Sequence, residues 1–246
     1  MTDTPAQTDK PMFRSDVTVE LVKHTAGDSD VLWAARVSTA GEQSLDELSK
    51  DPERSKGLIN YLMRDRHGSP FEHNSMTFFI SAPIFVFREF MRHRVGWSYN
   101  EESGRYRQLE PVFYVPGEDR KLVQQGRPGK YEFVQGDPKQ HQVVTEAMED
   151  SYRRSYEHYL AMLEAGVARE VARAVLPVGM YSSMYATCNA RSLMHFLGLR
   201  TQHELAKVPS FPQREIEMVG EKMEQHWATL MPLTYAAFNA NGRIAP

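Results

Sequence analysis

The stretch NSMTFFISAPIFVFREFMRHR, residues 74–94, decides the fold class, because its hydrophobic periodicity changes from that of a strand to that of a helix. Apolar side chains first alternate with their neighbours, which predicts a strand over residues 74–81. Pro83 suits the first turn of a helix. Residues 84–94 are then predicted to continue as that helix. A strand followed directly by a helix requires a fold that contains both.

The flanking sequence repeats both periodicities. Alternation predicts one further strand at residues 17–21 and another at 110–116. Helical spacing predicts segments at residues 28–37, at 58–63 with an end near 67–70, and at 143–165, 186–200 and 213–227. Strands and helices do not alternate regularly. The sequence therefore predicts an α+β fold with a mixed, largely antiparallel sheet packed with long helices.

The chain is predicted to form one domain between residues 17 and 246. Residues 1–16 carry two prolines and few apolar side chains, so they are expected to form a mobile N-terminal tail. Residues 117–140 are the most polar segment and contain several glycines and prolines, which predicts an exposed insertion.

Composition excludes several classes of protein. Hydrophobic residues make up 41% and charged residues 25% of the 246 residues, as in folded globular proteins. A formal net charge of −3 argues against a dedicated nucleic-acid binder. The longest apolar runs, such as residues 82–87, are too short to cross a membrane, and the N-terminus carries no apolar signal core. One cysteine, Cys188, cannot form an internal disulfide. We expect a cytoplasmic protein with no membrane partner.

The stretch RHRVGWSYNEESGRY, residues 92–106, concentrates hydrogen-bonding side chains. Its first arginine falls on the same helical face as Arg88 and Glu89, opposite an apolar face. One interpretation is a solvated face with a Glu89–Arg92 pair, which contributes only a few tenths of a kcal/mol, roughly. The continuation into further Asn, Glu, Ser and Arg residues favours a ligand site instead. Guanidinium groups bind phosphate and carbonyl edges, so the predicted ligand is anionic and planar.

This stretch resembles the signature of the flavin-dependent thymidylate synthases. RHR at residues 92–94 is followed by SYNEESGRY at residues 98–106, as in that signature. Eight residues separate Arg94 from Ser103, one more than in the commonest form, so the spacer at residues 95–97 is longer by one.

The resemblance covers residues 17 to 230 and includes three more segments. These are HGSPFEH at residues 67–73, REVARAVLP at residues 169–177 and NARSLMHFLGLR at residues 189–200. In the last segment, helical projection places Arg191 and His195 on a different side from Arg200. A helix with two polar sides is suited to a place between two ligands or two subunits.

The resemblance implies an activity and its cofactors. In that family, dUMP is methylated reductively to dTMP, 5,10-methylenetetrahydrofolate supplies the carbon, and NADPH reduces bound FAD. No cysteine nucleophile takes part, and no metal is implied. Members are homotetramers with each flavin bound between subunits. The expected partners are therefore dUMP, folate, NADPH and other copies of this chain, and neither nucleic acid nor membrane.

The resemblance also implies roles for individual residues. Arg200 is the expected catalytic residue, because it matches the arginine that binds the uracil edge and favours ionisation of the ring. The expected dUMP ligands are Glu89, Arg92, Glu101, Ser103, Gly104, Arg105, Arg173 and Arg200. The expected FAD ligands are His67, Ser69, Arg92, His93, Arg94, Glu101, Asn189, Arg191 and His195. The resemblance further implies that the Ser103 loop and Arg200 reach one nucleotide from different subunits.

Two other interpretations stay open at the level of sequence. Residues 92–105 could bind RNA without catalysis, with Trp97, Tyr99 and Tyr106 stacking on bases. A metal site could be built on His67, His73 and His93, although no third ligand lies near the first two in sequence. The net charge, and two matching segments far apart in the chain, weigh against the RNA-binding module. The lone cysteine, with no adjacent histidine, predicts a buried small side chain rather than a nucleophile.

Overall fold

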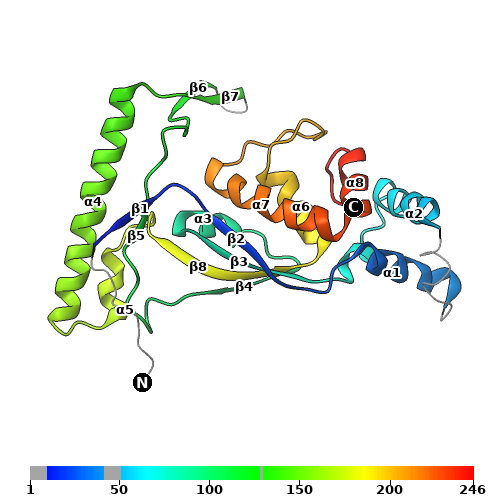
Figure 1. Ribbon diagram of the computed structural model, residues 1–246, viewed down its shortest axis with the longest axis horizontal. Helices are drawn as coiled ribbons and strands as arrows, with labels where there is room; N and C mark the ends of the chain where they lie inside the picture. The colour runs from blue at the N-terminus through cyan, green and yellow to red at the C-terminus, as the bar shows by residue number, and fades with distance from the viewer. Residues whose placement is uncertain (1–9, 42–50, 128–129) are drawn as a thin grey trace. The chain divides into compact units, whose positions relative to one another are not determined.

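The computed structural model describes residues 10–41, 51–127 and 130–246 (Figure 1). The chain divides into two compact units. The first unit contains the residues up to Asp16, Ala82–Phe85 and Glu102–Ser182. The second unit contains Val17–Ser81, Val86–Glu101 and Ser183–Pro246. Both strands and helices are present, which confirms the α+β class.

The second unit is built around a four-stranded sheet in the order β2-β3-β8-β4. Its strands are β2 (Thr18–His24), β3 (Met76–Pro83), β8 (Tyr181–Cys188) and β4 (Trp97–Glu101). The β2–β3 and β4–β8 pairs are antiparallel, in agreement with the prediction of a largely antiparallel sheet. In β3 every second side chain from Met76 to Ala82 is fully buried, which is the alternation expected of a strand with one face in the core.

Helices pack against this sheet and against one another. They are α1 (Asp28–Ala40), α2 (Pro52–Arg64), the short 3₁₀ helix η2 (Ser69–Glu72), α3 (Ile84–Phe90), α6 (Ala190–Arg200), α7 (Arg214–Leu230) and α8 (Pro232–Ala240). Helix α7 contacts β2, α6 and α8 (Figure 1). Its Trp227 is fully buried, with its ring edge-on to Phe238 of α8. Burial of such aromatic side chains is the main stabilising term for this unit.

The first unit has its own core. Strand β1 (Met12–Arg14) pairs in parallel with β5 (Val112–Tyr114), and β6 (Val123–Arg127) forms a hairpin with β7 (Lys130–Val134). The long helix α4 (Pro138–Glu164) and the short α5 (Arg169–Ala172) and η3 (Arg173–Val175) complete it. Phe113 of β5 stacks on Tyr152 of α4 at 5.0 Å between ring centroids. One face of α4 therefore lies in this core.

Helix α4 begins four residues after the end of β7 because its first turn is capped. Asp137 accepts a hydrogen bond from the backbone N–H of Gln140 at 2.8 Å, and the Gln140 side chain accepts one from the Asp137 N–H at 2.8 Å. Pro138 occupies the first helical turn, where no N–H partner is required.

The structure corrects three predicted boundaries. Helix α3 ends at Phe90 rather than at residue 94, and Pro83 is the last residue of β3. Residues 97–101, for which no strand was predicted, form β4 because they pair with β8. Residues 186–188, expected at the start of a helix, belong to β8, and the helix begins at Ala190 because Asn189 caps it.

Two expectations about the domain edges also change. Residues 12–14 were expected in a mobile tail but pair with β5, because their backbone groups complete a two-stranded sheet; residues 1–9 lie outside the described part of the chain. The expected insertion at residues 117–140 contains the β6–β7 hairpin and the first turn of α4, and most of its described residues are exposed or partly exposed.

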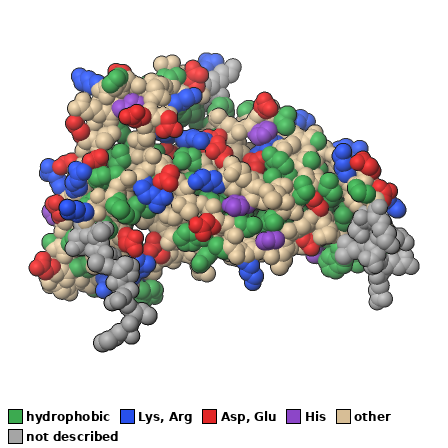
Figure 2. Space-filling view, viewed as in Figure 1, with side chains coloured by type: hydrophobic (Ala, Val, Ile, Leu, Met, Phe, Trp, Pro, Cys, Tyr) green, Lys and Arg blue, Asp and Glu red, His purple; other side chains and the backbone are tan. Residues whose placement is uncertain are grey.

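On the face drawn in Figure 2, acidic and basic side chains are interspersed, and no large patch carries charges of one sign only. This distribution agrees with a formal net charge of −3. No helix in the described ranges is both long and apolar enough to span a bilayer.

Candidate active site

Arg200, the last residue of α6, lies in a cluster with Glu89 of α3 and with His93 of the turn that follows α3. Its guanidinium donates one hydrogen bond through Nη1 to the carboxylate of Glu89 and another through Nε to Nε2 of His93 at 3.1 Å. The side chains of Arg200 and Glu89 are 17% and 24% exposed. An ion pair this shielded from water fixes the guanidinium more firmly than an exposed pair does. The structure therefore brings together three residues that the sequence placed in the site.

His93 faces Arg200 as an uncharged ring. An arginine N–H only donates, so Nε2 of His93 must accept and the ring proton must sit on Nδ1. The ring also packs edge-on against Phe196 of α6 at 4.9 Å between centroids. Burial, and then the positive charge of Arg200, lowers the pKa of His93 to about 4. Burial also raises the pKa of Glu89, with the nearby Arg200 charge acting in the opposite direction.

The lowered pKa of His93 predicts how the free energy of unfolding depends on pH. The pKa of His93 is lowered from its ordinary value of 6.5 to about 4, so the unfolded chain takes up a proton between these values while the folded chain does not. The free energy of unfolding should therefore fall as the pH drops from about 6.5 to about 4. Urea unfolding across this range measures it. The variant His93→Gln should show a shallower slope, and an equal slope in both proteins would contradict the assignment.

The other basic residues of this segment lie in the turn after α3. Arg92 and Arg94 are exposed and follow the helix end at Phe90. Their backbone path is set by the hydrogen bonds from Arg92 N to Glu89 O and from His93 N to Phe90 O. Glu101, the last residue of β4, is exposed as well. The resemblance assigns these three to bound ligands, and their exposure leaves them accessible for that role.

A second cluster surrounds Arg191 on the opposite side of α6. Its guanidinium donates to Glu72 Oε1 at 2.6 Å and to the backbone oxygen of Pro246 at 2.7 Å. A Cβ at Gly68 would lie 2.5 Å from the same guanidinium, so only glycine permits this approach. Because Gly68 stands between His67 and Ser69, the turn that carries both expected flavin ligands lies against Arg191.

The residues around Arg191 suit a flavin dinucleotide. His67 stacks on Tyr61 at 5.5 Å between ring centroids, and Ser69 is exposed at the start of η2. Partial burial, followed by the charges of Arg191 and Arg66, lowers the pKa of His195. That positive potential favours the diphosphate of FAD. Asn189 uses its carbonyl oxygen to cap α6, accepting from Ser192 N at 2.9 Å, so its amide nitrogen is the group it can offer a ligand.

In the first unit, four of the expected dUMP ligands lie close together: Ser103, Gly104, Arg105 and Arg173. Arg105 donates through Nε to Glu170 at 2.6 Å, and both side chains are more than half exposed. Ser103 Oγ accepts from the backbone N–H of Arg105 at 3.3 Å. A Cβ at Gly104 would lie 3.3 Å from the side chain of Arg173, so the serine turn packs against that arginine. An exposed ion pair contributes roughly 0–1 kcal/mol, so a phosphate can replace Glu170 at little cost.

Two acidic partners were missed by sequence reasoning. Glu72 holds Arg191, and Glu170 holds Arg105. Each partner lies 65 residues or more from its arginine. Glu72 does fall inside the HGSPFEH segment at residues 67–73, which was the available signal. Glu170 precedes Arg173 by three residues, and no periodicity marks it.

Cys188 cannot serve as a nucleophile in this environment. It is the last residue of β8, only 2% exposed, and burial raises the pKa of its thiol. We therefore expect Cys188→Ala to keep wild-type turnover and to lose about 1 kcal/mol of stability, because it removes one small buried group. Steady-state turnover and urea unfolding measure these effects. An inactive variant that still folds and carries FAD would reinstate a cysteine mechanism.

Gly96 holds the spacer against the start of α6. Its φ is +68°, and a Cβ there would collide with Ser192 Oγ. Ser192 Oγ in turn donates to the backbone oxygen of Val95 at 2.9 Å. Gly96→Ala should therefore cost at least about 1–2 kcal/mol in stability from the left-handed backbone alone. Gly57→Ala, within α2 and with nothing within 4 Å of its Cβ, is the matched control and should not destabilise. Equal urea midpoints for the two variants would contradict this role of Gly96.

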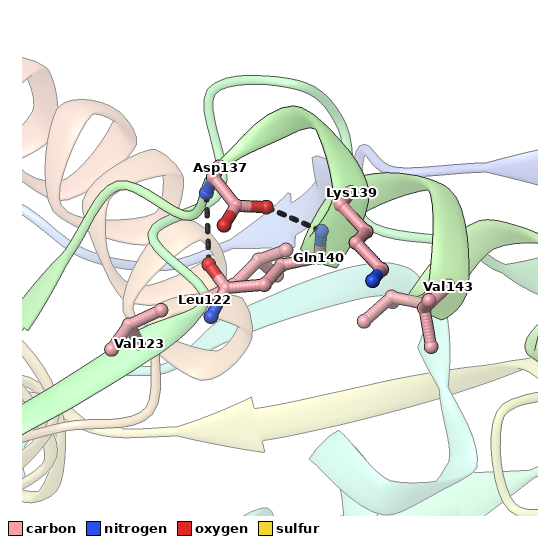
Figure 3. A pocket seen from close by; sticks show the side chains of 7 residues that line it. Leu122, Val123, Asp137, Lys139, Gln140 and Val143 are labelled. Atoms are coloured by element: carbon pink, nitrogen blue, oxygen red, sulfur yellow. Dashed lines mark hydrogen bonds between the residues drawn. The ribbon is translucent and has the colours of Figure 1, made fainter.

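A hollow of the first unit is lined by none of these residues. It has a volume of about 370 Å³ and is lined mainly by Leu122, Val123, Val143 and Val144. Asp137 and Gln140, at its rim, bind each other in the cap of α4 (Figure 3). Two of its three polar lining residues are thus paired with each other, and the third is Lys139. Within the described ranges, no three His, Cys, Asp or Glu side chains are grouped so that they could hold a metal ion.

The fold and these clusters define an enzyme that binds anionic, planar ligands, and comparison with known proteins identifies its family. The family model described as "Thymidylate synthase complementing protein" matches residues 20–233. The flavin-dependent thymidylate synthase of Streptomyces avermitilis is 86% identical over 246 residues, which cover 100% of both chains. That of Tropheryma whipplei is 56% identical over 238 residues, which cover 96% of this chain and 98% of the relative.

A solved structure agrees with the sequence relatives. The UMP/dUMP methylase PolB from Streptomyces cacaoi, bound with 5-Br UMP, superposes with a TM-score of 0.87 at 54% identity. The match covers 96% of this chain and 100% of that chain. The chain belongs to the flavin-dependent thymidylate synthases, which confirms the family that residues 92–106 resemble.

Proposed function

We propose that this chain methylates dUMP reductively to dTMP, with 5,10-methylenetetrahydrofolate as carbon donor and NADPH as reductant of bound FAD. The observation that carries the proposal is the cluster at the end of α6, where Arg200 is held by Glu89 and His93. The relatives named above as flavin-dependent thymidylate synthases, and the methylase described with a bound uridine nucleotide, support the same activity.

Arg200 is proposed to stabilise negative charge on the uracil ring. Two of its donors are already used by Glu89 and His93, and the remaining N–H groups form a planar edge that matches a carbonyl and ring nitrogen. Because the guanidinium is fixed before the substrate binds, it needs little reorganisation as charge develops. Glu89 and His93 orient this group, and Glu89 also offers an acceptor to the ring.

The phosphate is proposed to be held by Arg92, Arg105 and Arg173, with Ser103, Gly104 and Glu101 completing the hydrogen bonds. Ser103 is assigned here as a ligand, since its hydroxyl accepts from the Arg105 N–H and keeps its own proton to donate. His67, Ser69, Arg94, Asn189, Arg191 and His195 would hold FAD, together with Arg92, His93 and Glu101. Bound FAD would supply the hydride. We further propose a cytoplasmic homotetramer, with each flavin site shared between subunits.

The purified protein tests this proposal directly. We expect a yellow protein that releases FAD on denaturation, whose flavin absorbance shifts on titration with dUMP. It should form dTMP when 5,10-methylenetetrahydrofolate and NADPH are added. UMP is assayed beside dUMP, because one relative is described as acting on both. A colourless protein whose nucleic-acid affinity falls steeply with salt would instead support the RNA-binding interpretation.

A further inference from the structure

Tyr99, in the middle of β4, ties that strand to the turn that carries Arg92, His93 and Arg94. Its hydroxyl donates to the backbone oxygens of Phe90 at 3.0 Å and His93 at 2.8 Å, sharing one hydrogen between them. We propose that Tyr99 is a positioning residue for the methylation reaction. It holds His93 in the place where the His93 ring accepts a hydrogen bond from Arg200. This inference rests on the proposed function.

The Tyr99 hydroxyl adds a side-chain donor to the backbone hydrogen bonds of the turn after α3. Helix α3 ends at Phe90, and the turn that follows is held by the bonds from Arg92 N to Glu89 O and from His93 N to Phe90 O. Tyr99 adds a second donor to the Phe90 oxygen and is the donor to the His93 oxygen. The position of the turn therefore depends on a side chain from β4 as well as on its own backbone hydrogen bonds.

The position of the hydroxyl is itself determined by aromatic packing. The Tyr99 ring lies parallel to Trp97, with 5.7 Å between centroids and 9° between planes. It also lies edge-on to Phe90, and both Trp97 and Phe90 contact Phe196 of α6. Partial burial raises the pKa of Tyr99, which keeps the hydroxyl protonated as a donor.

His93 links the position of the turn to the position of the Arg200 guanidinium. Its backbone oxygen is bound by Tyr99, and its ring nitrogen accepts from Arg200 Nε. A shift of the turn therefore shifts the acceptor that orients Arg200. Misplacement of a catalytic group by about 1 Å can lower a rate a hundredfold. If only the hydrogen bond between His93 and Arg200 is disturbed, the rate is expected to fall by less than a hundredfold, because Glu89 still holds the guanidinium.

The variant Tyr99→Phe keeps the ring stack and removes only the hydroxyl. We expect kcat for dTMP formation to fall by roughly tenfold, with little change in KM for dUMP and with FAD retained. Tyr235→Phe is the matched control, since it removes a hydroxyl from a ring packed edge-on against Trp227 elsewhere in the second unit. It should leave kcat unchanged.

A double-mutant cycle tests whether Tyr99 acts through His93. If it does, Tyr99→Phe should lower kcat much less in a His93→Gln background than in the wild type, because the ring it positions is already gone. If Tyr99→Phe lowered kcat by the same factor in both backgrounds, Tyr99 would not act through His93. A wild-type kcat in Tyr99→Phe would overturn the proposal outright.

Titration of the His93 ring by NMR gives a readout that does not require activity. The pKa of His93 is expected near 4 in the wild type and should rise toward 6.5 in Tyr99→Phe, as a looser turn admits water to the ring. An unchanged titration would contradict the positioning role. A wild-type protein that makes no dTMP would refute the proposed function, and this titration would still decide whether Tyr99 holds His93.

Discussion

Arg200→Ala is expected to reduce dTMP formation by at least a factor on the order of 10²–10³, the typical loss when one preorganised donor to a developing anion is removed. The truncation also leaves Glu89 without its ion-pair partner and His93 without the N–H that its ring accepts. FAD should stay bound, because the Arg191 cluster lies on the other side of α6. Single-turnover assays with dUMP and flavin absorbance measure the two effects separately.

Arg200→Lys should recover little of this loss. A lysine ammonium is a point charge and cannot make the two fixed hydrogen bonds to Glu89 and His93 while also presenting a planar edge. Arg154→Ala on α4 is a matched control, since this arginine forms a largely exposed pair with Asp150. It should keep wild-type turnover. Turnover in Arg200→Ala close to that of the control would refute the role of Arg200.

Mixing two inactive variants is expected to restore activity. The proposed site takes the Ser103 turn from one subunit and Arg200 from another, so Ser103→Ala and Arg200→Ala impair different halves of each site. When the two are co-expressed, random assembly leaves roughly a quarter of sites with both residues intact. Oligomers that carry both variants, isolated through separable tags, should therefore regain roughly a quarter of wild-type turnover from an almost inactive background.

The same experiment has a built-in control. Oligomers that carry two differently tagged copies of Arg200→Ala must stay inactive, which shows that the tags themselves do not restore turnover. If one chain supplied both residues, no mixed oligomer could contain an intact site. Mixed oligomers that bind FAD yet show no recovery would therefore rule out the shared-site arrangement while leaving the roles of the two residues untouched.

Much of the fold could be predicted from local periodicity. The alternation at residues 74–81 predicted β3, and the helical spacing at residues 143–165 predicted most of α4. These patterns are reliable because each element buries one face. Strand β8 was not predicted, because its first two residues are both buried and alternation is weak there. The end of α3 at Phe90 was also missed, and its last carbonyl accepts from Tyr99 of β4, which is a tertiary contact.

The family and the candidate ligands could be predicted from residues 92–106 and 189–200, because these stretches carry their chemistry in short, contiguous patterns. How these ligands are held depends on contacts between distant parts of the chain. Glu89 and His93 contact Arg200 across more than 100 residues of chain, and Glu72 contacts Arg191 across 119. Ion pairs of this kind leave no periodic trace in a sequence, because their geometry exists only after the sheet and α6 have packed together.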